Sequence, residues 1–209
     1  LRNGNLLRLN YGIAVLHALL MACFVALPLA LQEQAGLPRE NHWWVYLTAL
    51  LLSFVAMVPL IIYAERQRQI KRVVLGAILL LAATQPIMWL SMNSLTGLVI
   101  ATVLFFIAFN VLEATLPSML SKIAPAGSKG TAMGIYSTSQ FAGAAIGGVL
   151  GGAVYGSFGL GGVFVCCALL AISWFAIGAT MTEPPYVTSY RLAVDPILVR
   201  DEAFLRRVL

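Results

Sequence analysis

Six long apolar runs dominate this chain, and each is close to the roughly 20 residues that an α-helix needs to cross a bilayer. They cover approximately residues 11–31, 45–64, 73–91, 97–120, 132–155 and 161–181. Glu113 is the one acidic residue inside them. Because backbone groups in lipid must be hydrogen-bonded within the segment, runs of this length favour helices. We therefore predict an all-α membrane protein with six transmembrane helices.

The distribution of positive charge indicates how these helices are oriented. The chain is 60% hydrophobic and only 10% charged, so most of its solvent is lipid. Of its 13 Lys and Arg residues, all but Arg39 fall on one side of the alternating spans. Cytoplasmic flanks carry such an excess, which predicts that both termini are cytoplasmic. The net charge of +5 then follows from topology and requires no nucleic-acid partner.

The three cysteines, Cys23, Cys166 and Cys167, lie inside predicted spans and lack the spacing of metal ligands. We interpret them as small packing residues and expect neither a metal site nor a cofactor.

The end of the chain differs in character from the bundle. Pro184 and Pro185 end the last helix. Residues 187–194 then alternate like a short strand, and a helical pattern begins at Asp201. We predict a membrane bundle over 1–182, followed over 183–209 by a cytoplasmic linker and the start of a truncated α/β domain. Because the first residue is not Met, we expect the chain to be part of a longer protein.

Small residues line one side of the fifth predicted span. In water each interior Gly costs a helix about 1 kcal/mol relative to Ala, but in a bilayer small residues four apart let two helices approach closely. The spacing predicts a helix-packing surface with two adjacent ridges. Its glycines are Gly134, Gly143, Gly147, Gly148, Gly151 and Gly152.

Local motifs carry a resemblance to a known family. Residues 129–134, KGTAMG, resemble the basic-Gly-x-x-x-Gly signature of the eleventh helix in major facilitator superfamily transporters. The glycine spacing from Gly134 to Gly151 is similar to the family's antiporter motif, with Gly148 in place of its proline. The hairpin 65–72, ERQRQIKR, resembles the remnant acidic-basic loop of the second half. The similarity is densest over 110–186.

The chain thus resembles the second six-helix half of such a transporter, and within the superfamily most resembles the YajR-like bacterial inner-membrane transporters. The resemblance implies a twelve-helix protein with two bundles around a cavity, in which the missing N-terminal six-helix half is the partner. It also implies a multi-pass protein of the bacterial inner membrane. The tail would be the start of a ferredoxin-like domain.

Ionisable residues within spans are expensive in lipid and indicate function. Glu113 lies roughly 10 Å inside the cytoplasmic end of the fourth span, and His17 lies roughly 9 Å inside that of the first. In the family these two helices line the cavity. We hypothesise a hydrated, proton-exchanging pair. The alternatives are that Glu113 fastens a helix kink or closes a gate, and that His17 is a packed, hydrogen-bonded residue.

Other polar residues are candidates for the substrate cavity or for gating. Asn110, Gln140 and Gln85 carry amides that a substrate could bind, although interhelical hydrogen bonding is the simpler interpretation of many such groups. At the inner hairpin, Glu65 next to Arg66 and Arg68 suggests a conformational latch, whereas retention of positive charge explains the two arginines equally well.

We therefore expect a secondary transporter half that exports a small organic solute against proton entry, and not an enzyme. The alternative is a six-span receptor or assembly protein, without transport activity, whose cytoplasmic tail binds a ligand. An intramembrane protease is disfavoured because the last span offers no His to activate a serine.

Overall fold

The computed structural model describes residues 3–184, and within that range it is helical without any strand. The tail predicted over 187–209 lies outside the described residues. Five long helices follow one another, joined by short helical turns, a π-helix at 30–34 and 3₁₀ turns at 39–41 and 126–128. The long helices are α1 (Gly4–Leu29), α2 (His42–Arg66), α3 (Ile70–Leu90), α4 (Leu95–Ile123) and α5 (Lys129–Ala179). All five are long and apolar enough to cross a membrane, judged by length and composition.

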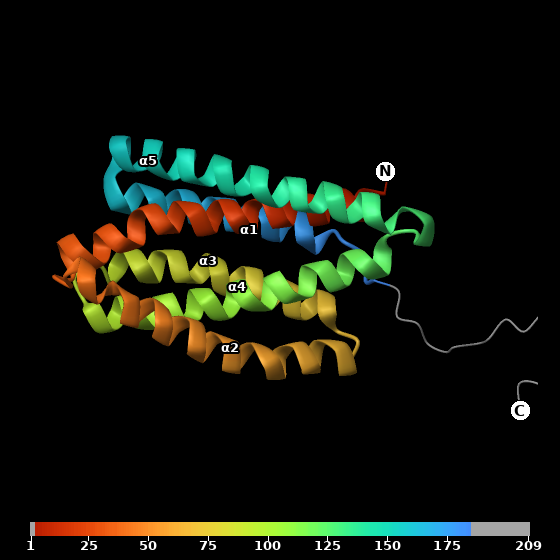
Figure 1. The fold of residues 1–209 in the computed structure, drawn as a ribbon, viewed down its shortest axis with the longest axis horizontal. Coiled ribbons are helices and arrows are strands. Elements are labelled where there is room, and N and C mark those ends of the chain that lie inside the picture. Colours follow the sequence, from red (N-terminus) through yellow and green to blue (C-terminus); the bar gives the residue numbers. More distant parts are fainter. Residues whose placement is uncertain (1–2, 185–209) are drawn as a thin grey trace, which may run out of the picture.

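One residue divides α5, which is 51 residues long. Gly159 has φ 68° and ψ −166°, a region that essentially only glycine adopts. The chain turns back near this point, as Figure 1 shows at the end of the bundle far from the N-terminus. α5 therefore has a first arm (129–158) and a second arm (160–179). Sequence reasoning expects a loop of about five residues here, but one non-helical glycine takes its place.

α1 lies against both arms of α5. A Cβ added at Gly147 would stand 2.3 Å from the Ala18 backbone, and one added at Gly12 would stand 2.6 Å from the Trp174 indole. Contacts this close exist only because glycine has no side chain. On the other side, α3 reaches the second arm through Trp89, which lies beside Gly161. The first and last helical segments thus form one packed unit.

α2 is the most exposed helix of the bundle. Leu51, Phe54 and Val55 are each at least 60% exposed, whereas α1 and α4 contribute more residues to the buried core than the other helices do. An apolar helix with so little burial requires lipid or another protein segment as its neighbour. α2 is fastened to the bundle mainly along α4, where Ser53 is fully buried.

Candidate functional site

α1, α4 and the first arm of α5 bring three predicted residues together along the line where they meet, here called the groove. His17 comes from α1, Glu113 from α4 and Gln140 from α5. Gln140 belongs to the inward stripe of the first arm, because it continues the three- and four-residue spacing of the buried positions there. Those buried positions are Ala132, Tyr136, Gly143, Gly147 and Gly151.

Gln140 bridges the other two side chains. Its Nε2 lies 2.8 Å from Nε2 of His17 and donates to Oε1 of Glu113 at 3.3 Å. On the far side of the ring, Nδ1 of His17 lies 3.2 Å from the carbonyl oxygen of Ile13. A carbonyl only accepts, so Nδ1 carries the proton and Nε2 of the neutral ring accepts from Gln140. The two amide hydrogens thus serve one acceptor each.

This arrangement depends on the protonation state of His17. A proton on Nε2 would face the amide nitrogen of Gln140, and two donors cannot bond to each other. An acceptor is nearby, because Oε2 of Glu113 lies 3.8 Å from Nε2 of His17 and is buried without a hydrogen-bond partner. The His17 side chain is 11% exposed and that of Glu113 is 37% exposed. The site therefore has two hydrogen-bond patterns that differ by one proton.

Tyr136 extends this site and was missed by sequence reasoning. It lies one helical turn before Gln140 on the buried stripe and is 3% exposed. Its hydroxyl is buried and has no hydrogen-bond partner. The four-residue spacing to Gln140 was the available signal, but an aromatic residue at such a position usually serves only packing.

The other two side-chain amides predicted for the cavity, those of Asn110 and Gln85, lie outside this cluster. Asn110 donates to the hydroxyl of Ser53 on α2 at 2.8 Å, so it turns away from Glu113 although the two are three residues apart. Gln85 is fully buried, where its oxygen accepts from the thiol of Cys23 at 3.4 Å and its nitrogen donates to the Leu81 carbonyl at 3.3 Å. Both positions favour the simpler interpretation, interhelical hydrogen bonding.

At the hairpin 65–72, Glu65 forms a salt bridge that sequence reasoning did not predict. Nζ of Lys122, near the end of α4, lies 2.6 Å from Oε2 and 2.7 Å from Oε1 of Glu65. The hydroxyl of Ser118 donates to Oε1 at 2.9 Å. Arg68 occupies the turn between α2 and α3 with φ 55°, a left-handed conformation uncommon in residues other than glycine. This ion pair joins α2 to α4.

The two glycine ridges of the first arm have different surroundings. Gly143, Gly147 and Gly151 face Ala14, Ala18 and Ala22 of α1, and a Cβ on any of the three would come within 2.1 to 2.8 Å of the α1 backbone. Gly148, Gly152 and Gly134 have no such neighbour within 4 Å. Only the first ridge packs within the described bundle.

No cluster of three or more His, Cys, Asp or Glu side chains in residues 3–184 has an arrangement that could hold a metal ion.

Comparison with known proteins identifies the family of this chain. The profile of the Major Facilitator Superfamily matches residues 9–201. The chain belongs to this superfamily. The match confirms the resemblance seen in the motifs of residues 129–134 and 65–72.

Curated relatives of the chain are transport proteins by name. It is 48% identical, over all 209 residues, to the inner membrane transport protein YajR of Escherichia coli (strain K12), covering 46% of that protein. It is 36% identical over 136 residues to an uncharacterized transporter of Buchnera aphidicola subsp. Acyrthosiphon pisum (strain APS), covering 65% of this chain and 35% of the relative. The chain thus spans less than half the length of these relatives.

Proposed function

We propose that this chain forms one six-helix half of a secondary transporter, which exports a small organic solute in exchange for protons by alternating access. The bridge from Gln140 to His17 and Glu113 is the observation that supports proton coupling, because it joins three helices through a contact that one proton changes. Membership of the superfamily and the 48% identity to an inner membrane transport protein support the transport role.

In this proposal each helical arm of α5 crosses the membrane once, which gives six crossings and places both termini in the cytoplasm. The interruption at Gly159 and the one-sided Lys and Arg distribution support this topology. The protein would lie in the bacterial inner membrane, as the name of the E. coli relative states for that protein. The other six helices would pack on the exposed faces of α2 and of the first arm of α5.

Proton binding would act on the helices through the hydrogen bonds of the bridge. With neutral His17, the Gln140 amide connects α1 to α4 through α5. A proton on Nε2 of His17 takes away the acceptor of one Gln140 amide hydrogen and favours a direct ion pair between His17 and Glu113. A cationic group of the solute that bound the Glu113 carboxylate would compete with this ion pair, and so with the proton, as an exchanger requires.

The conformational latch at Glu65 is proposed with Lys122 as its partner. Because the salt bridge of Glu65 to Lys122 joins the inner ends of α2 and α4, its breaking and reforming would accompany movement of α2 relative to the cavity-lining α4. Arg66 and Arg68 would provide further partners for Glu65 when that movement separates it from Lys122.

The decisive test compares Glu113→Gln with unmodified transporter in proteoliposomes. Efflux of a panel of fluorescent organic cations is measured with and without a proton gradient across the membrane. We expect the substitution to abolish the stimulation by the gradient, and Glu183→Gln, outside the groove, to leave it intact. Stimulation that is unchanged in Glu113→Gln would contradict proton coupling at this site. Absence of gradient-driven flux in the unmodified protein, over a broad solute panel, would favour a receptor or assembly role.

A further inference from the structure

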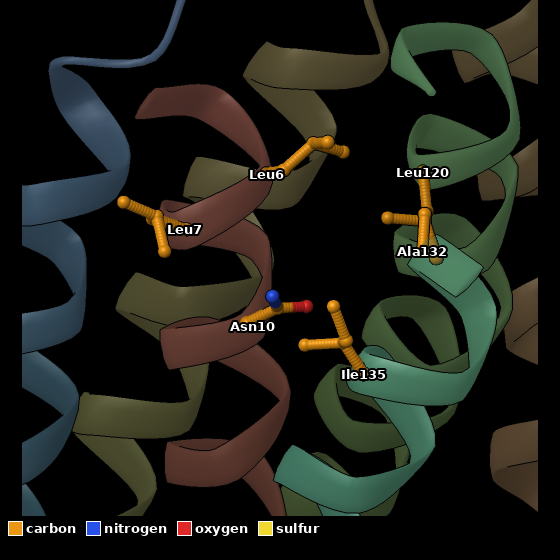
Figure 2. A pocket seen from close by; sticks show the side chains of 6 residues that line it. All are labelled: Leu6, Leu7, Asn10, Leu120, Ala132 and Ile135. Carbon is orange, nitrogen blue, oxygen red and sulfur yellow. The ribbon is translucent and has the colours of Figure 1, made fainter. Parts of the chain in front are cut away.

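A cavity of about 200 Å³ lies in the groove that holds the candidate site, nearer the end of the bundle where α1 begins. Its six lining residues come from α1, α4 and the first arm of α5, and Asn10 is the one polar side chain among them (Figure 2). Figure 2 shows Asn10 projecting from α1 toward Ile135 on α5. The lining residues are Leu6, Leu7, Asn10, Leu120, Ala132 and Ile135.

Helical register places this cavity directly along the groove from the His17–Glu113–Gln140 cluster. Asn10 precedes His17 by seven residues, and Leu120 follows Glu113 by seven, which in each helix is two turns on the same face and about 10 Å along the axis. On α5, Ala132 at the cavity and Gln140 at the cluster are separated by two four-residue steps. Tyr136 lies at the midpoint of those steps.

Buried polar atoms without a hydrogen-bond partner lie between the Asn10 cavity and the His17–Glu113–Gln140 cluster. Among residues 3–184, four buried side-chain oxygens lack a hydrogen-bond partner. Three of them, on Asn10, Tyr136 and Glu113, lie in this groove, and the fourth is the hydroxyl of Tyr46 on α2. Buried polar atoms in proteins are nearly always hydrogen-bonded, and ordered water supplies the partner where no protein group does.

We propose that this groove binds a chain of water molecules that runs from the Asn10 cavity, past the Tyr136 hydroxyl, to Glu113, and that protons reach the His17–Glu113 pair along it. The Asn10 amide orients water in an otherwise apolar cavity. The Tyr136 hydroxyl both donates and accepts, so it passes a proton by accepting one hydrogen bond and donating the other. Tyr136 is a positioning and relay residue here: its oxygen takes a proton from one water as its own proton passes to the next, and rotation of the O–H bond then restores the initial orientation.

The charged and titratable groups near this route have partners of their own and do not interrupt the proposed water chain. Glu113 faces His17 from α1 and Gln140 from α5. Tyr11 on α1 hydrogen-bonds to Ser173 on the second arm of α5, and Arg8 donates to Thr180 directly after that arm. Lys122 on α4 is paired with Glu65 of α2.

The inference rests on the proposed proton coupling and is tested without a transported solute. The complete transporter in lipid nanodiscs is subjected to a light-triggered proton release, and protonation of Glu113 is followed by its carboxyl infrared band, assigned with Glu113→Gln. We expect Tyr136→Phe and Asn10→Leu each to slow the rise of this band by at least about fivefold, with unchanged final amplitude. Tyr46→Phe removes an equally unsatisfied hydroxyl outside the groove and should leave the rate unchanged.

Equal rates in Tyr136→Phe and Tyr46→Phe would overturn the relay. Hydroxyl-radical footprinting of the unmodified protein tests the water itself and needs no variant: we expect Tyr136 to be oxidised several-fold faster than Tyr46, because bound water generates the radical locally. Equal oxidation of the two tyrosines would overturn the water chain. Absence of a Glu113 carboxyl band at any pH would instead contradict proton coupling, while the footprint would still report whether water is bound.

Discussion

The contact between α1 and the first arm of α5 has two parts with opposite chemistry. Toward the turn at Gly159, Gly147 and Gly151 lie against Ala18 and Ala22 with no room for a Cβ. The same two helices are also joined by the polar pair Gln140 and His17, which overlaps the Gly143–Ala14 contact along the helix axis, and the Asn10 cavity lies between them nearer the start of α1.

The difference shows how one helix pair can be both rigid and responsive. A contact of glycine against alanine backbone contains no rotatable side chains, so it has a single arrangement. A contact through Gln140 and His17 has alternative donors and acceptors, so it has at least two. The close contact fixes the register of α5 on α1, and this register places Gln140 beside His17.

The largest expected effect comes from breaking the close contact. In Gly147→Val, the added Cβ would stand 2.3 Å from the Ala18 backbone, and the two helices would have to separate. Overpacking of this kind costs about 3 kcal/mol or more when backbone cannot move aside. We expect the variant to unfold at much lower denaturant concentration, or to fail to accumulate in the membrane.

Gly148→Val is the matched control on the neighbouring ridge. It adds the same side chain to the same helix, but no atom lies within 4 Å of its Cβ position. We expect the free energy of unfolding of this variant to lie within about 1 kcal/mol of that of the unmodified protein. If both variants were equally unstable, the distinction between a packed and an open ridge would be wrong.

A smaller loss is expected from the polar part of the contact. Gln140→Leu leaves Nε2 of His17 and Oε1 of Glu113 without the donor that serves both. Each buried group left unsatisfied costs about 1 to 3 kcal/mol, less where water enters. In denaturant unfolding, the free energy of unfolding should fall by about 1 to 2 kcal/mol. Transport should also no longer depend on the proton gradient. Gradient-driven transport that survives in Gln140→Leu would show that the bridge is structural.

The smallest effect is expected at the ends of α2 and α4 that carry Glu65 and Lys122, outside this contact. Lys122→Met removes a partly exposed salt bridge to Glu65, and such pairs contribute about 0 to 1 kcal/mol. Transport rate is the more sensitive readout if the pair acts as a latch. The exchange of charges in Glu65→Lys with Lys122→Glu should restore the rate lost in either single variant. A double variant as slow as the single ones would contradict the latch.

Sequence reasoning reached part of the candidate site because depth in the membrane follows from residue counting. A helix rises 1.5 Å per residue, so His17 and Glu113 could be placed at matching depth, and the structure brings them within 3.8 Å. Gln140 was proposed only as a substrate ligand, and its bridging position depends on the rotation of α5. The functional roles of all three remain predictions.

Sequence reasoning was less accurate for side chains whose direction is set by the rotation of their helix. Asn110 and Glu113 are three apart, which puts them within about 60° on one helix face. That angle is enough for one to face α2 while the other faces the groove. Lys122 was counted only as a cytoplasmic positive charge, because its partner Glu65 is 57 residues away in the chain.

By itself the sequence determined that this chain forms long apolar helices and carries two glycine ridges with the same four-residue spacing. Both are local properties, since hydropathy and helical period act over neighbouring residues. Tertiary structure decided which ridge is buried and which polar groups meet. Gly143, Gly147 and Gly151 pack on α1 while Gly148 and Gly152 remain open, because the rotation of each helix is set by the fit of its whole surface against helices distant in the chain.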